Sequence, residues 1–400
     1  MLKKAVIAGC VFILLCGSCP IVQAQEEFVD QPSQELTTVP FTQLTGGILI
    51  LHARLGDLPD TLNFILDTGS SGISLDSSTA ARLQLKPIPT ERTIRGIASM
   101  HKVSFLYNQT LHFPGLSIQH LDFHINDYTI ITAVYGEKID GIIGYSVLSR
   151  YILKIDYDKH EVTFCSNGSL RYPRGGYILR PSFRKLVSQP LRVKDAKKVY
   201  SDFLFDLGAG LCMLFSKNFI HDTELLSGKR KKWNKQGEGL GGKLDMELTV
   251  IKEVKVGPYR FRKVPVYIFN DDYNVTSYPA MGGLLGNDIM RRFNVVLNYH
   301  NGEIFIKPNK HYNENFDYSY SGVELYLVNG IIVVGDIAKG SPAEAAGLRE
   351  GDQVLGVNKD FSQNLNAYKI ALQAAKENVK FYIQRNGDLI DIEFKILSII

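Results

Sequence analysis

The sequence predicts a mainly β chain in which two related β lobes are followed by a small α+β domain. Three observations lead to this prediction. Short apolar runs broken by turn residues fill residues 40–309, a pattern typical of strands. The same succession of motifs occurs twice within that region. Residues 318–400 differ, with a turn-rich stretch, a helical segment and closing strands.

The composition is that of a globular protein long enough for more than one domain. The chain has 400 residues, of which 45% are hydrophobic and 22% are charged. The net charge of +4 is small, and the chain has no basic or acidic tail. The sequence therefore gives no reason to expect a nucleic-acid partner.

Residues 1–24 have the pattern of an export signal. Two lysines precede the apolar segment Ala5–Cys16, and residues 22–24 have the small-residue spacing of a cleavage site. We therefore expect an exported chain in the periplasm or cell envelope that begins near Gln25, with residues 25–39 as a linker or a propeptide. No later apolar run is long enough to span a bilayer, so we expect no transmembrane span in the mature chain.

The cysteines add two expectations. A lipid anchor at Cys19 ranks second to simple cleavage, because Cys16 stands where an apolar residue normally precedes a lipidated cysteine. Only Cys165 and Cys212 remain in the mature chain, each in a strand-like apolar run. An oxidising compartment would allow them to pair, and two buried thiols fit the sequence at least as well.

The duplication is visible in two long segments. Residues 140–164 read DGIIGYSVLSRYILKIDYDKHEVTF, and residues 282–306 read GGLLGNDIMRRFNVVLNYHNGEIFI. Each has a glycine, two apolar residues, a glycine, a short helix-like piece, an arginine, an aromatic residue and two strands. Gly144 and Gly286 are 142 positions apart, as are Arg150 and Arg292. This constant offset predicts two similar lobes, residues 40–165 and 166–309.

Each lobe also places an aspartate after an apolar strand. Asp67 lies in FILDTGSSGISLD, residues 64–76, and Asp206 lies in LFDLGAGLCMLFS, residues 204–216. A carboxylate in an apolar setting is costly unless it is paired or takes part in chemistry. The two positions are 139 residues apart, so the duplication predicts that they are equivalent.

Two carboxyl groups brought together across a pseudo-twofold axis have a defined chemistry. Repulsion between two nearby negative charges makes it costly for both to ionise, so they share a proton and titrate with two apparent pKa values. The ionised partner can accept a proton from a water that attacks a peptide carbonyl, while the protonated partner donates toward the carbonyl oxygen. Gly69 and Gly208 would allow close backbone approach, and the Thr68 hydroxyl would bond across to the opposite loop.

Other segments predict the elements around these motifs. Strands are expected in GGILILHARL, KVSFLYNQTLHF, LTVIKEVKV and RKVPVYIF, and helices in SSTAARLQL and SKNFIHDTELL. Residues 310–317 are polar and are expected to form a flexible linker. The nine histidines show no metal-ligand spacing, so we expect neither a metal nor a cofactor.

The C-terminal region resembles the PDZ domains of bacterial envelope proteins. The likeness rests on KGSPAEAAGLREGDQVLGVN, residues 339–358, and extends over residues 318–400. It implies that Pro342 begins a short helix and that Gly347, Gly351 and Asp352 form the turn into a strand. It also implies a groove that binds an extended peptide by its C-terminal carboxylate, at residues Tyr320, Ser321, Gly322 and Val323. A domain that only packs against the lobes is the alternative.

The motifs of the two lobes resemble the aspartic proteases. DTGSSG at residues 67–72, DGIIG at residues 140–144 and LLGN at residues 284–287 are similar to the bacterial retropepsin-like group that carries a C-terminal PDZ domain. The resemblance implies a bilobed pepsin- or retropepsin-like fold that hydrolyses peptide bonds of protein or peptide substrates in a cleft. It assigns catalysis to Asp67 and Asp206, and support of the active-site loops to Thr68, Gly69, Ser70 and Gly208.

The resemblance also implies flap hairpins over the cleft. RGIASMHKV, residues 95–103, is the first flap, with Gly96, Ile97 and Ala98 as candidates for substrate contact. EGLGGKLDM, residues 238–246, is the second flap, with Gly239 and Gly241. The basic run GKRKKWNK, residues 228–235, precedes the second flap, and we interpret it as a solvated loop in preference to a substrate or lipid contact.

The second aspartate motif departs from the family pattern. Leu207 follows Asp206 where a threonine or serine is usual, so one of two symmetric hydroxyls is missing. This departure leaves a catalytically impaired peptide-binding protein as the alternative function. An envelope serine protease with a PDZ domain is a second alternative, which the missing Gly-X-Ser-X-Gly motif disfavours.

Overall fold

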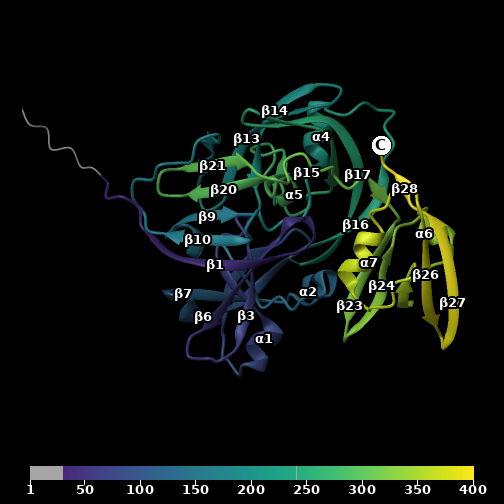
Figure 1. Cartoon of the computed structure of the whole chain (residues 1–400), viewed down its shortest axis with the longest axis horizontal. Coiled ribbons are helices and arrows are strands. Elements are labelled where there is room, and N and C mark those ends of the chain that lie inside the picture. The colour runs from purple at the N-terminus through teal and green to yellow at the C-terminus, as the bar shows by residue number, and fades with distance from the viewer. Residues whose placement is uncertain (1–29, 240) are drawn as a thin grey trace, which may run out of the picture.

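The computed structural model describes residues 30–239 and 241–400, which form a bilobed β body with a smaller domain at one end (Figure 1). The predicted export signal, the lipidation alternative at Cys19 and the predicted mature start at Gln25 lie outside the described residues. Among the described residues, no helix is both long and apolar enough to cross a membrane. The mainly β fold class predicted from the sequence is confirmed.

The first lobe is a barrel whose strands follow the order β1-β2-β3-β8-β4-β7-β6-β5, closed by a further pairing of β2 with β6. Short helices cap its ends, and α1 follows the first aspartate motif as predicted. The elements are β1 (Glu35–Gln43), η1 (Thr45–Gly47), β2 (Leu49–Leu55), β3 (Thr61–Leu66), β4 (Ile73–Asp76), α1 (Ser77–Arg82), β5 (Ile88–Arg95), β6 (Met100–Phe113), β7 (Leu116–Asn126), α2 (Thr129–Tyr135), β8 (Gly141–Ile143) and α3 (Tyr145–Leu148).

The second lobe repeats this plan in the order β12-β13-β14-β19-β15-β18-β17-β16, with β13 also pairing with β17. Its strands β17 and β18 cover the two segments expected as strands there. The elements are β12 (Ser182–Phe183), β13 (Val187–Lys194), β14 (Lys198–Phe205), β15 (Met213–Ser216), α4 (Lys217–Thr223), β16 (Trp233–Gly239), β17 (Gly242–Val256), β18 (Tyr259–Phe269), β19 (Gly283–Leu285) and α5 (Asn287–Met290).

A sheet shared by both lobes joins them. Its order is β11-β21-β20-β9-β10-β1, from β11 (Tyr177–Leu179), β21 (Glu303–Pro308), β20 (Phe293–Asn298), β9 (Ile152–Asp156) and β10 (Glu161–Cys165). At its centre Leu153 pairs with Leu297 and Ile155 pairs with Val295. Since Val295 and Leu297 are the repeat counterparts of Leu153 and Ile155, this register is self-complementary. The pseudo-twofold axis therefore passes between β9 and β20.

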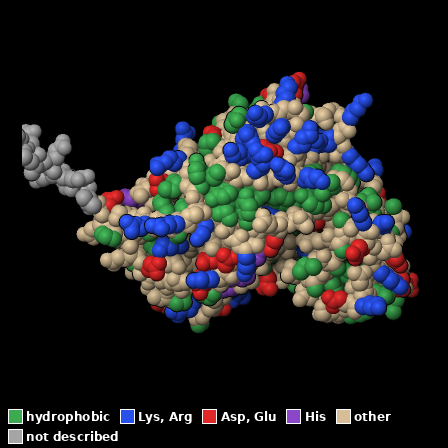
Figure 2. All heavy atoms as spheres, turned by 45° about the horizontal axis from the view of Figure 1, so that its top comes forward, with side chains coloured by type: hydrophobic (Ala, Val, Ile, Leu, Met, Phe, Trp, Pro, Cys, Tyr) green, Lys and Arg blue, Asp and Glu red, His purple; other side chains and the backbone are tan. Residues whose placement is uncertain are grey.

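The C-terminal domain has its own apolar core and a five-stranded sheet in the order β23-β24-β25-β26-β27. Figure 2 shows it as a rounded bulge set off from the body by a hollow. As expected, Pro342 opens the short helix α6, which Ser341 caps. The elements are β22 (Ser319–Tyr320), β23 (Val323–Val328), β24 (Ile331–Ile337), α6 (Pro342–Ala345), β25 (Gln353–Val357), α7 (Leu365–Ala371), β26 (Asn378–Arg385), β27 (Asp388–Lys395) and β28 (Leu397–Ser398).

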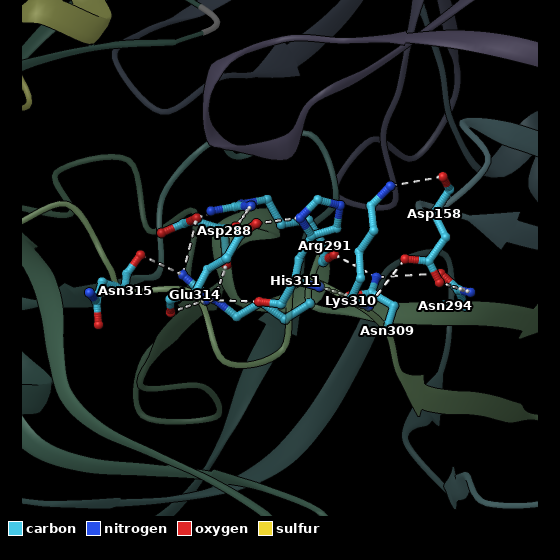
Figure 3. A network of polar contacts seen from close by, with 10 residues as sticks. Asp158, Asp288, Arg291, Asn294, Asn309, Lys310, His311, Glu314 and Asn315 are labelled. Carbon is cyan, nitrogen blue, oxygen red and sulfur yellow. Dashed lines mark hydrogen bonds and ion pairs between the residues drawn. The ribbon is translucent and has the colours of Figure 1, made fainter.

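The connection at residues 310–317, expected to be flexible, is held in place by two arginines that follow α5. Arg291 forms ion pairs with Asp288 and Glu314, at 2.7 and 2.8 Å (Figure 3). The fully buried Arg292 donates hydrogen bonds to the backbone carbonyls of residues 311, 314 and 315, and its guanidinium lies 4.2 Å from the centre of the Phe316 ring. A buried guanidinium needs these acceptors, so the chain that supplies them is fixed.

Candidate active site

The two aspartates lie at equivalent places in their lobes. Asp67 follows the last residue of β3, and its amide donates to the carbonyl of Ile143, at 2.9 Å. Asp206 follows β14, and its amide donates to the carbonyl of Leu285, at 3.0 Å. Both acceptors belong to short strands, β8 and β19, that run parallel to the aspartate strand. The Gly-apolar-apolar-Gly motif is thus the element that positions each aspartate.

The aspartate loops approach each other across the pseudo-twofold axis. Each carboxylate accepts a hydrogen bond from the glycine amide two residues later, Gly69 at 2.6 Å and Gly208 at 2.8 Å. A β-carbon on Gly69 would lie 2.6 Å from Oδ2 of Asp206, and one on Gly208 would lie 2.6 Å from Oδ1 of Asp67. Each glycine therefore faces the carboxyl group of the opposite lobe, where a side chain has no room.

The environment of the dyad favours a shared proton. Burial raises the pKa of both Asp67 and Asp206 above the ordinary value of 3.8. The two carboxyl groups share a hydrogen bond, and the neighbouring charge of Asp67 raises the pKa of Asp206 further, to well above the ordinary value. Like charges this close cannot both ionise at low cost. The pair therefore retains one proton over a range in which ordinary aspartates have lost theirs.

Thr68 connects the two loops. Its side chain is 1% exposed, its hydroxyl donates to the carbonyl of Phe205 at 2.6 Å, and it accepts from the amide of Leu207 at 3.0 Å. Both partners are backbone groups of the second lobe that flank Asp206. One hydroxyl of the first lobe therefore fixes the loop that carries the second carboxylate.

Leu207 occupies the position of the missing hydroxyl. Its side chain is fully buried and belongs to the main apolar core of the two lobes. Thr68 bonds only to backbone on that side, and both aspartates keep their glycine amide bonds. The departure from the family pattern therefore removes one connection between the loops and leaves the geometry of the carboxylates in place.

Ser70 supports the first loop through its backbone. Its carbonyl accepts from the amide of Tyr145 at 3.0 Å, at the start of α3. Its own amide helps to stabilise the charge of Asp67, which lowers the pKa of that carboxyl. In the described part of the chain, no histidine side chain hydrogen-bonds to Ser70 or to Ser71. A serine nucleophile at this loop would thus lack a general base.

Both flap candidates are hairpins, and their tips meet. The first, β5–β6, turns at residues 96–99, where the amide of Gly96 donates to the carbonyl of Ser99, at 2.8 Å. The second is β16–β17. A β-carbon on Gly239 would lie 2.5 Å from Cγ2 of Ile97, and one on Gly241 would lie 2.6 Å from the amide nitrogen of Ser99.

Ile97 extends this contact toward the dyad. It packs on an apolar cluster of the second lobe that includes Leu204 and Leu284, and Ala209 of the Asp206 loop packs on the same cluster. Ala98 lies beside Ile97 in the same turn, between β5 and β6. The two flap tips therefore touch each other, and the first tip rests on the second lobe.

The loop predicted to receive a peptide carboxylate borders a cavity of about 760 Å³ between the C-terminal domain and the lobes. Tyr320, Ser321 and Val323 line the cavity, and Gly322 adopts a φ of 76° in the same loop. At its other side the cavity reaches Gly210, which follows the second aspartate motif. The cavity thus lies between the candidate peptide site and the dyad loop.

Sequence reasoning did not find Tyr135, which borders the same cavity at the end of α2. A β-carbon on Gly210 would lie 3.3 Å from its hydroxyl oxygen. Burial raises the pKa of Tyr135, and the charges of Glu238 and Asp206 add to this effect. The residue has no counterpart at the repeat spacing, so no pattern in the sequence marked it.

Two other expectations are settled by the packing. Cys165 and Cys212 are both free and buried, so they do not pair with each other, and the thiol of Cys212 donates to Asp288 at 3.0 Å.

The interpretation of the basic run, residues 228–235, as a solvated loop was wrong for its last residues. Trp233 is 8% exposed and packs with Tyr320 of the C-terminal domain, while Lys235 forms an ion pair with that domain. These contacts lie between distant parts of the chain.

Comparisons with known proteins agree with the motifs. The sequence model described as aspartyl protease matches residues 51–147 and again residues 190–289. The model described as PDZ domain matches residues 319–396. A search of curated proteins finds no match. The chain thus carries two aspartyl protease repeats and a C-terminal PDZ domain, as the resemblance implied.

Proposed function

We propose that this chain, a protease of two aspartyl protease repeats with a C-terminal PDZ domain, is an exported aspartic endopeptidase. The observation that carries the proposal is the pair of buried carboxyl groups of Asp67 and Asp206, which occupy equivalent positions of two lobes, each against the glycine of the opposite loop. Export rests on the N-terminal sequence pattern alone.

The chemistry follows from the protonation of the pair. The ionised carboxylate accepts a proton from a water as the water oxygen bonds to the carbonyl carbon of the substrate. The protonated carboxyl donates its proton to the carbonyl oxygen, so a neutral diol forms. The proton held by the first carboxylate then passes to the amide nitrogen as the carbon–nitrogen bond breaks. One hydroxyl of the diol returns its proton to the second carboxylate, so a carboxylic acid and an amine leave and the dyad regains its starting protonation. The flaps would exclude bulk water during these steps.

The symmetry of the loops favours catalysis over the impaired peptide-binding alternative. The glycine amide bonds to the two carboxylates differ by only 0.2 Å, at 2.6 and 2.8 Å. Thr68 bonds to both backbone groups that flank Asp206, so the lobe that contains Leu207 still has a fixed loop. The serine protease alternative has no support in the contacts of Ser70 and Ser71.

The test is the cleavage of an unbiased peptide mixture by residues 25–400, followed by mass spectrometry from about pH 3 to 8, a range that includes ordinary and raised carboxyl pKa values. Asp67→Asn and Asp206→Asn are compared with Asp127→Asn, which changes an exposed aspartate outside the site. We expect cleavage by the parent and by Asp127→Asn, no cleavage by either dyad variant, and no effect of a serine-directed inhibitor. A folded parent that cleaves no peptide at any pH would contradict the proposal.

A further inference from the structure

We propose that the PDZ domain keeps the cleft closed: helix α2 of the first lobe fills the domain's peptide groove, and strands β23 and β24 hold the second flap. A peptide carboxy terminus that replaces α2 would release this closure. The inference rests on the proposed function only in its last step, the effect on cleavage. The contacts that carry it lie entirely outside the dyad.

The groove is identified by its elements. β23 is the edge strand of the PDZ sheet, α7 packs beside it, and the loop Tyr320–Val323 leads into it. PDZ domains bind an extended peptide as an added strand along such an edge, because the edge offers unpaired backbone groups. Any segment that lies between β23 and α7 therefore competes with a peptide.

Helix α2 lies in that place. It contacts β23 directly. On the other side Lys369 of α7 donates to the carbonyl of Val134 at 2.5 Å, and a β-carbon on Gly136 would lie 2.9 Å from Cδ2 of Leu365. The hydroxyl of Thr45 adds a hydrogen bond to Asn366, at 3.1 Å. Helix α2 and its neighbouring loop thus fill the part of the groove that lies between β23 and α7.

The carboxylate end of the groove faces the cavity between the C-terminal domain and the lobes. Ser321 and Val323 border the cavity of about 760 Å³, together with Leu372 of the helical side and Tyr135 of α2. The cavity gives a peptide carboxy terminus room beside the loop, but a peptide cannot extend along β23 without moving α2. Entry of a ligand and departure of α2 are for this reason coupled.

The second contact is a clamp on the second flap. Lys243 of β17 forms an ion pair with Asp336 at 2.6 Å, and Lys235 of β16 pairs with Glu324. The hydroxyl of Tyr326 donates to Glu238 at 2.6 Å. Glu324 and Tyr326 alternate along β23 with residues of the PDZ core, so the clamp and the groove share one strand.

The contact between the two flap tips connects this clamp to the region of the dyad. The clamped hairpin touches the tip of the first flap at Ile97 and Ser99, and Ile97 packs on the same apolar cluster as Ala209 of the Asp206 loop. The resemblance implies that the flaps lie over the cleft, so under the proposed function a substrate parts the two tips to reach the carboxylates. The PDZ domain holds one of these tips, so its release lowers the free energy needed to open the cleft.

The experiment measures amide hydrogen exchange of the flap tips in full-length mature protein carrying Asp206→Asn, so that the result does not depend on activity. Lys243→Met removes a clamp ion pair, and Lys369→Met removes the bond to α2. Lys232→Met is the matched control, because Lys232 pairs with Glu247 within the same hairpin, at 2.7 Å, and does not reach the PDZ domain. We expect exchange about fivefold faster in both test variants, equivalent to about 1 kcal/mol, and no change in the control.

A ligand arm and an activity arm complete the test. A library of ten-residue peptides with free carboxy termini should speed tip exchange in the Asp206→Asn protein, whereas the amidated library should not. With Asp206 restored, Lys243→Met should cleave peptides faster than the parent. Exchange at the parent rate in both test variants would overturn the inference, as would faster exchange without faster cleavage in an active enzyme. Faster exchange in a chain that never cleaves peptides would support the clamp and contradict the endopeptidase proposal.

Discussion

Replacing Thr68 by valine tests the connection between the lobes. Valine has nearly the same shape as threonine, so Thr68→Val removes the hydroxyl without leaving a cavity. The change deprives the carbonyl of Phe205 and the amide of Leu207 of their partner in a site that is 1% exposed. Each buried backbone group left without a partner costs about 1–3 kcal/mol. Because both groups flank Asp206, the change acts on stability and on the dyad together.

We expect Thr68→Val to lower the free energy of unfolding by about 2–6 kcal/mol, because two buried backbone groups lose their hydrogen-bond partner. Thr68→Ser keeps the hydroxyl and loses only a methyl group, so it should lose about 1 kcal/mol. The assay is urea unfolding followed by far-ultraviolet circular dichroism, together with the kcat/KM for one peptide substrate. Valine and serine variants of equal stability and equal activity would refute the reasoning, since the hydroxyl would then have no role.

Three further predictions follow from the same loops. Gly208→Ala places a β-carbon against the Asp67 carboxyl and should reduce kcat/KM at least about 100-fold, as steady-state kinetics would measure. Leu207→Thr restores the family hydroxyl but removes a buried apolar side chain; thermal unfolding should show a loss of about 2 kcal/mol, not a gain. Asp206 has a raised pKa in the folded state, so its contribution to stability is complete below about pH 4 and is lost as the pH rises through that folded pKa. The free energy of unfolding of Asp206→Asn, measured in urea, should therefore rise relative to that of the parent between pH 4 and pH 7. A difference between the two proteins that falls over this pH range would contradict the prediction.

The sequence could predict the parts of the site that the duplication repeats. Asp67 and Asp206, their glycines and the Gly-apolar-apolar-Gly strands have counterparts at a nearly constant offset, and each motif needs only its own lobe to take shape. The two hairpins could be placed for the same reason. Local pattern and internal repetition were enough there because each aspartate, its glycine and its supporting strand have a counterpart in the other lobe.

The contacts that involve the PDZ domain could not be predicted in this way. Lys235 was one cation in a basic run, and its pairing with Glu324 depends on how a non-repeated domain docks on the second lobe. Tyr135 and α2 have no equivalent in the second half of the chain. The polar linker appeared flexible because its acceptors are backbone carbonyls, and only the folded structure places Arg292 among them.

The central claim is that Asp67 and Asp206 share one proton across the two lobes. The most direct measurement is a titration of Asp side-chain carboxyl carbons by nuclear magnetic resonance, in the parent and in the Asp67→Asn variant. We predict one carboxyl in the parent with a pKa well above the ordinary 3.8, belonging to Asp206, and a fall of that pKa when Asp67 loses its charge. A pKa of Asp206 that is unchanged by Asp67→Asn would show that the two carboxyl groups titrate independently, and the account would be contradicted.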